Sequence, residues 1–156
     1  MLEDSVEGFI ATWRPYATVA DFFSTTEGSP LLECRVAGVI FHVFERTGPY
    51  TAPVGRGEVI IHPVAESVSQ VDDSGSAIEV AGISCLKVRG RVVYRDDRML
   101  VVDVGVPLVV GVLKGTGEDL AVGDCAAFES LAPVHGFLLP RAGYQPSPMP
   151  PAAEEI

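Results

Sequence analysis

Residues 88–131 read VRGRVVYRDDRMLVVDVGVPLVVGVLKGTGEDLAVGDCAAFESL, and this stretch carries the pattern that decides the fold. Basic residues alternate with valine and glycine at its start, which predicts a strand with one polar face. Gly90 lies within that strand, where the absence of a side chain permits sharp coiling. Residues 96–97 are both aspartate and predict a turn, followed by strands over residues 98–105 and 106–113. Together these elements predict a small antiparallel β-barrel.

The two strands within residues 98–113 are apolar at almost every position apart from Asp103. Antiparallel strands with one wet face alternate between polar and apolar residues, so we expect both faces of this pair to be covered. The cover is either the N-terminal segment of the same chain or a second protein molecule. The second hypothesis predicts an interface made of Trp13, Leu100, Val102, Val104, Leu108, Val110 and Val112.

The other strands follow from runs of β-branched and aromatic residues. Residues 31–46 predict one long strand that bends at Gly38, and residues 47–57 predict an irregular connection. Pro63 indicates a sheet edge or a bulge. The remaining strands are predicted over residues 58–66, 77–83, 120–130 and 134–139.

Near the N-terminus, Val6, Phe9, Ile10 and Trp13 recur at spacings of three and four, which predicts a helix that ends before Pro15. Asp4 or Ser5 is the expected cap, and a second helical turn is predicted over residues 18–23. We expect Trp13, Phe22 and Phe23 to cover a barrel end or a sheet; the alternative is a helix that binds a partner.

The predicted organisation therefore has three parts. An N-terminal helical segment spans residues 1–30, a β-barrel domain spans residues 31–139, and a flexible tail rich in proline spans residues 140–156. The predicted fold class is mainly β, with additional N-terminal strands and a short helical segment beside the barrel.

Charge argues against non-specific nucleic-acid binding, because 11 Lys and Arg stand against 21 Asp and Glu, for a net charge of −10. Residues 86–98 are a local exception, since cations outnumber the aspartates there. These cations either lie on the solvent-exposed face of a strand, paired with carboxylates, or bind phosphate groups. The second hypothesis predicts a nucleic-acid surface made of Lys87, Arg89, Arg91, Tyr94, Arg95 and Arg98.

Two short motifs lie on either side of the acidic turn and the predicted hairpin: V-x-G-x-V at residues 88–92 and L-x-V-G-D at residues 120–124. Their order, with the acidic turn and the two hairpin strands between them, resembles the anticodon-binding-like branch of the oligonucleotide/oligosaccharide-binding (OB) fold, over about a third of the chain. The matching residues are Val88, Gly90, Val92, Leu120, Val122, Gly123 and Asp124. The resemblance implies single-stranded nucleic-acid binding, but residues 98–113 contain no aromatic side chain on which a base would stack.

Neither a catalytic nor a metal site is predicted, and no cofactor. His42, His62 and His135 fall in separate predicted strands, and none of the three cysteines forms a C-x-x-C pair. An odd number of cysteines and an acidic start without a basic, apolar leader predict a cytoplasmic protein with free thiols. No apolar run is long enough to cross a bilayer, so no membrane partner is expected.

These observations predict a non-enzymatic β-barrel module for binding or assembly, which engages a protein partner or forms a homo-oligomer. Two alternatives stay open. One is a single-stranded nucleic-acid-binding protein that uses the basic strand within residues 87–98, and the other is a small enzyme whose site has no recognisable motif.

Overall fold

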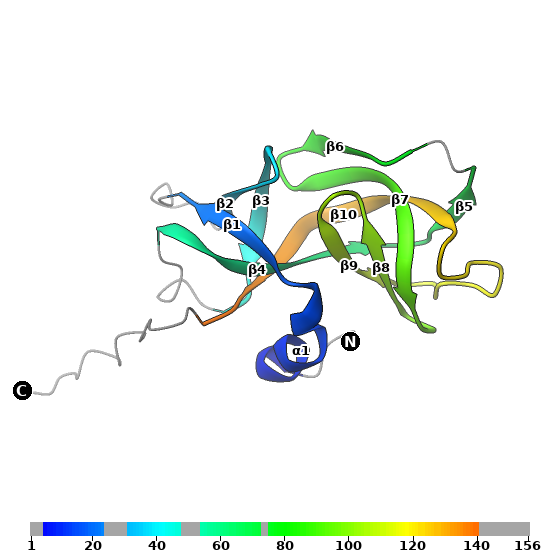
Figure 1. The fold of residues 1–156 in the computed structure, drawn as a ribbon, viewed down its shortest axis with the longest axis horizontal. Coiled ribbons are helices and arrows are strands. Elements are labelled where there is room, and N and C mark those ends of the chain that lie inside the picture. Colours follow the sequence, from blue (N-terminus) through cyan, green and yellow to red (C-terminus); the bar gives the residue numbers. More distant parts are fainter. Residues whose placement is uncertain (1–4, 24–30, 48–53, 73–74, 141–156) are drawn as a thin grey trace, which may run out of the picture.

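The computed structural model describes residues 5–23, 31–47, 54–72 and 75–140 (Figure 1). The chain is mainly β, with 61% of residues in strands and 9% in helices. Helix α1 (Val6–Trp13) is followed by a short 3-10 turn, η1 (Arg14–Tyr16). The strands are β1 (Thr18–Phe22), β2 (Leu31–Val36), β3 (Val39–Glu45), β4 (Gly55–Ala65), β5 (Ser69–Val71), β6 (Ala77–Gly82), β7 (Cys85–Arg95), β8 (Met99–Asp103), β9 (Pro107–Val112) and β10 (Cys125–Leu138).

Eight strands close into a barrel in the order β10-β3-β2-β1-β4-β9-β8-β7, because β7 pairs back onto β10. Strands β5 and β6 lie outside this ring, hydrogen-bonded to β10 and β7 respectively. The pairs β3–β10 and β4–β9 are parallel, and β4 also pairs directly with β10. The predicted fold class, a mainly β barrel with extra strands and one short N-terminal helix, is confirmed.

Strand β7 has the alternating pattern expected of it, with Val88 and Val92 buried and Lys87 and Arg91 exposed. Gly90 is needed in its middle, because a Cβ atom there would lie 2.5 Å from Val104 Cγ1 and 2.7 Å from the Asp103 carbonyl oxygen. The turn after β7 is also as predicted. The Asp96 carboxylate accepts hydrogen bonds from the backbone N–H groups of Arg98 and Met99, at 2.9 and 2.7 Å.

Two apolar clusters cover the two faces of β8 and β9. Leu100, Val102, Leu108, Val110 and Val112 belong to the barrel interior. Met99, Val101 and Val109 point the other way, into a second cluster that α1 covers from outside the barrel (Figure 1). The chain itself therefore supplies the cover of this pair, which was the first of the two hypotheses.

Helix α1 begins and ends as the sequence predicted. The Ser5 side chain accepts a hydrogen bond from the Gly8 N–H, and Pro15 lies in η1, just beyond the helix. The Phe9 ring stacks on Phe137 at a centroid distance of 4.2 Å, and Trp13 meets the edge of Tyr94 at 5.3 Å. These aromatic contacts attach the helix to the barrel wall.

The second helical turn predicted over residues 18–23 is wrong. Residues Thr18–Phe22 form β1, which pairs with both β2 and β4. Phe22 consequently lies in the barrel interior and not in a lid. The alternation of buried Ala20 and Phe22 with more accessible residues fits a strand, and two neighbouring strands stabilise it.

The single curved strand predicted over residues 31–46 is wrong as well. It is a hairpin, with Val36 opposite Val39 and a two-residue turn between them. Ala37 and Gly38 have φ angles of 51° and 83°, the left-handed geometry that matches the twist of a tight hairpin. Gly38 therefore reverses the chain, whereas the prediction had it bend one strand.

Smaller differences concern the ends of elements. Residues 55–57 of the predicted connection belong to β4, and residues 48–53 lie outside the described part of the chain. Residues 125–138 of the two last predicted strands form one strand, β10. Its register against β4 shifts opposite Pro63, but the extra residues lie in β10, between Leu131 and His135, and not at Pro63 itself. The predicted tail lies outside the described residues except for Pro140. Within the described part, no helix has the length and apolarity needed to cross a membrane.

Candidate functional site

The predicted nucleic-acid residues do not share one surface. Lys87, Arg89 and Arg91 lie on the outer face of β7, opposite residues of β10. Arg91 donates a hydrogen bond from Nη1 to the Gly123 carbonyl at 2.7 Å, so this guanidinium holds the turn that leads into β10.

An extra residue, Val93, enters β7 as a bulge and changes the face on which the next side chains lie. Tyr94 packs against Trp13 and donates a hydrogen bond to the Asp96 carboxylate, which raises the pKa of Tyr94. Arg95 pairs with Leu100 across the hairpin and donates to Thr116 Oγ1 at 2.7 Å and to the Gly117 carbonyl. Arg98 is exposed at the β7–β8 turn.

The predicted interface residues lie in the core. Leu100, Val102, Leu108, Val110 and Val112 are fully buried in the barrel, and Val104 is half-buried against the same cluster. Trp13 is 7% exposed in the cluster beneath α1. The hypothesis that these side chains form a surface for a second molecule is therefore wrong for the folded chain, because they already pack against each other.

The histidines and cysteines are distributed over several elements. On the outside of the β2–β3 hairpin, His42 Nε2 lies 3.6 Å from Glu33 Oε1. His62 Nδ1 lies 2.6 Å from the Val109 carbonyl oxygen. Burial, and then the charge of Glu33, raise the pKa of the Cys34 thiol from 9.0 to about 12. Among residues 5–23, 31–47, 54–72 and 75–140, no three His, Cys, Asp or Glu side chains come together as metal ligands.

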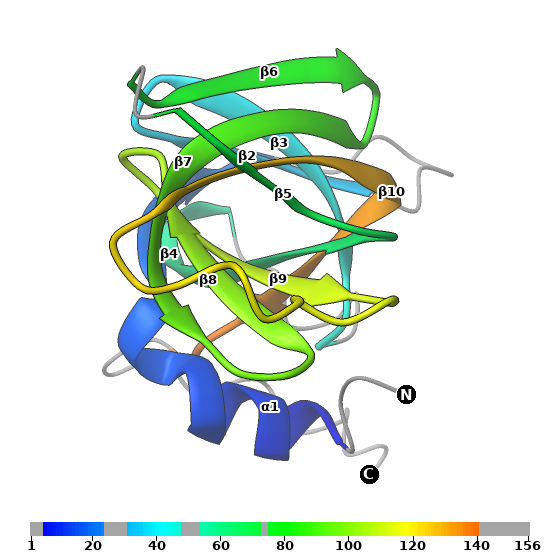
Figure 2. The same cartoon turned by 90° about the vertical axis from the view of Figure 1, so that its right-hand side faces the viewer.

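One edge of the sheet lies at β6, which forms the outermost strand in Figure 2. Within the described part of the chain β6 pairs with β7 alone, so its second edge presents backbone N–H and C=O groups outward. Every residue of β6 except Ile78 is exposed. Val80 is 42% exposed, and Ile83 in the turn after β6 is 73% exposed.

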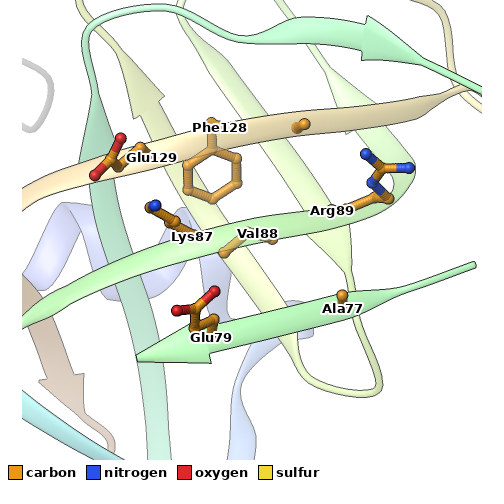
Figure 3. A pocket seen from close by; sticks show the side chains of 8 residues that line it. Ala77, Glu79, Lys87, Val88, Arg89, Phe128 and Glu129 are labelled. Atoms are coloured by element: carbon orange, nitrogen blue, oxygen red, sulfur yellow. The ribbon is translucent and has the colours of Figure 1, made fainter. Parts of the chain in front are cut away.

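A shallow hollow of about 440 Å³ lies along the first half of β6, on the outer face of β6, β7 and β10 (Figure 3). One row of directly opposed residues crosses it as Glu129, Lys87 and Glu79. A second row has Arg89 between the small side chains of Ala127 and Ala77, which leave the hollow open.

An apolar groove lies at the other end of β6. Its lining comes from Ile40 and His42 of β3 and from residues 80–83. Ser84, directly after the groove, donates a hydrogen bond to the His42 carbonyl and accepts one from the Val134 N–H at 2.8 Å. These bonds hold the β6–β7 turn beside β3, so the groove has two walls that are fixed to each other.

Both hollows thus border the same exposed strand, and the sequence prediction missed this. Residues 77–83 were correctly predicted as a strand, but a strand pattern does not say which neighbours a strand has. The sequence carries no signal of an edge, because apart from Glu79 residues 77–83 are uncharged and without proline, whereas sheet edges usually carry lysine or proline.

No protein-family model matches the chain, and the comparisons with curated proteins and with solved structures found no match either.

Proposed function

We propose that this protein is a non-enzymatic binding module that takes up an extended segment of a partner protein as an additional strand along β6. The observation that carries the proposal is the second edge of β6, to which no strand of the described residues pairs, with a charged hollow beside its first half and an apolar groove beside its second half. Addition of a strand to an exposed edge is an established mode of peptide recognition, because backbone hydrogen bonds supply affinity and flanking pockets supply specificity.

The composition of β6 supports this use. Sheet edges in monomeric proteins are protected by lysine, proline or very short strands, because an open edge invites pairing with another chain. β6 has six residues, AIEVAG, of which only Glu79 is charged. Its single irregularity is the extra residue Ala81, close to the end of the strand, so the preceding residues present a regular edge. β5, the other strand outside the ring, has only three residues.

The barrel supports the proposal as a rigid base. β7 pairs with β6 on one side and with β10 on the other, within the closed ring. The edge of β6 is consequently preorganised, and a bound segment bears most of the ordering cost. The thiols of Cys34, Cys85 and Cys125 fit a reducing compartment, so we propose that this binding takes place in the cytoplasm.

The test is selection of a random octapeptide library displayed on phage against the purified protein. Val80→Lys puts a charge at the edge of β6 and is expected to abolish retention of the selected peptides. Val19→Lys is the matched control, since Val19 is 53% exposed on β1, a strand paired on both sides. Hydrogen exchange of the Ala77–Gly82 amides is expected to slow when a selected peptide is added.

Peptides that bind both variants equally, without protection of the β6 amides, would show that β6 is not the binding edge. Peptides that Val19→Lys also fails to retain would show an effect of general charge. Either result overturns the proposal.

A further inference from the structure

We infer that the partner segment carries lysine or arginine at the position directly opposite Glu79, with β-branched or other apolar residues on both sides of that cation. This inference rests on the proposed addition of a strand to β6, and it specifies the chemistry of the segment. The partner is therefore a cationic, alternating β-segment of another protein and not a second copy of this chain.

A row of alternating charges ends at Glu79. Glu129, Lys87 and Glu79 lie directly opposite one another on β10, β7 and β6, all on the outer face and all exposed (Figure 3). Neighbouring strands are about 4.8 Å apart, so the fourth place in this row lies beside Glu79. Lys87 already has a carboxylate on each side. A cation in the fourth place would give Glu79 a second neighbour of opposite charge, whereas an acid there would be repelled.

The positions before and after the cation would lie beside apolar residues of β6. Successive residues of a strand point to opposite faces, so the neighbours of the cation lie opposite Ile78 and Val80. Ile78 packs against the barrel core, and Val80 lines the apolar groove together with Ile40 and Ile83. Apolar side chains at these positions would bury exposed apolar surface, and each Å² removed from water stabilises the complex by about 25 cal/mol.

A second copy of this chain would not supply the cation from its outer strands. The two strands outside the ring, β5 and β6, read SQV and AIEVAG and contain no lysine or arginine. Pairing of β6 with either strand of another copy would leave Glu79 without a new cation. The net charge of −10 on each copy adds long-range repulsion, and the same charge attracts a basic segment.

The experiment compares octapeptides selected on the native protein with those selected on Glu79→Lys. We expect the native protein to retain sequences with one lysine or arginine between two apolar residues, and Glu79→Lys to retain aspartate or glutamate at that position. Two synthetic peptides that differ only in this residue, Lys against Glu, should differ about five-fold in Kd on the native protein, with the order reversed on Glu79→Lys. High salt should shrink the difference. Glu118→Lys, a charge change in the loop after β9, is the control and should leave the preference unchanged.

Three results would overturn the inference, and they are distinguishable. Retained peptides that depend on β6 but show no charge preference would refute the cation and leave the proposed function standing. Failure to retain any peptide that depends on β6 would refute the proposed function together with the inference. A dimer in light scattering that Val80→Lys dissociates, and Val19→Lys does not, would identify a second copy as the occupant.

Discussion

Gly90 of β7 lies so close to Val104, which follows β8, that a Cβ atom at position 90 would meet Val104 Cγ1 at 2.5 Å. The Asp103 carbonyl oxygen would lie at 2.7 Å, so part of the obstacle is backbone and does not move aside by a change of rotamer. The lack of a side chain at position 90 therefore allows the segment after β8 to pack directly on β7. Gly90 also lies opposite Ala126 of β10, in the pair of strands that closes the barrel.

Gly90→Ala is expected to lower the free energy of unfolding by about 3 kcal/mol or more, since overpacking a core typically costs 1–3 kcal/mol even where side chains alone must move. Gly82→Ala is the control, because its nearest contact, Cys85 Cβ, is 3.7 Å away. Urea unfolding followed by circular dichroism measures both. Equal midpoints for the two variants would contradict the prediction.

Phe9→Ala is expected to cost about 3–5 kcal/mol, the range for removal of a buried aromatic side chain. Phe9 stacks on Phe137 and lies 4.8 Å from the His62 ring, so its loss opens a cavity between α1 and the barrel wall. Thr12→Ala removes an exposed residue of the same helix and should change stability little. If the two variants unfold at the same urea concentration, α1 does not stabilise the barrel.

Stability is expected to fall as the pH rises above 9, because of Cys34. Burial raises the pKa of this thiol from 9.0 to about 12, so the unfolded chain releases the proton first and the folded chain keeps it. The contribution of the neutral thiol is present below pH 9 and is lost as the pH rises towards 12. Cys34→Ala should therefore be less stable than the native protein at neutral pH, and the difference should narrow in alkali. If the free energies of unfolding of Cys34→Ala and of the native protein differ by the same amount at every pH, the thiol does not cause the loss of stability.

Arg95→Ala is expected to loosen the loop after β9. Arg95 donates to the Thr116 hydroxyl, which in turn donates to the Asp96 carbonyl, so this guanidinium adds to the bonds between the loop and the β7–β8 turn. Faster hydrogen exchange is expected at the Thr116 amide, which bonds to the Asp97 carbonyl at 3.0 Å. The effect corresponds to about 1–2 kcal/mol. Arg98→Ala, three positions further on and exposed, is the control and should leave that exchange rate unchanged.

Much of the barrel was predictable because local patterns carried it. The alternation around Gly90, the aspartates of the β7–β8 turn and the continuous apolar run of β8 and β9 each have a direct physical meaning, and the structure confirms all three. The hairpin at Ala37 and Gly38 was missed because a glycine between two apolar runs permits either a bend or a reversal. The choice depends on the partners that β2 and β3 find in the ring.

The candidate site was less predictable. Alternation placed Lys87, Arg89 and Arg91 on one face of a strand, and they do share the outer face of β7. The basic hypothesis extended that surface to Tyr94, Arg95 and Arg98, which lie beyond the bulge at Val93. The predicted interface residues were chosen because their strands are apolar on both faces, and that pattern does not say whether the same chain or a second molecule covers them. The barrel interior and the cluster under α1 bury most of them. The edge of β6 could not be recognised from the sequence, because a strand pattern does not show whether a strand has a neighbour on each side.

The amino-acid sequence alone determined the class of fold, the helix at the N-terminus, the coiling of β7 at Gly90 and the burial of β8 and β9 on both faces. All of these depend on residues near each other in the chain. Only the tertiary structure decided which strands pair, that β6 is left at an edge and that Glu79 ends a row of alternating charge. Those properties arise from contacts between segments far apart in the chain, and local periodicity carries no information about them.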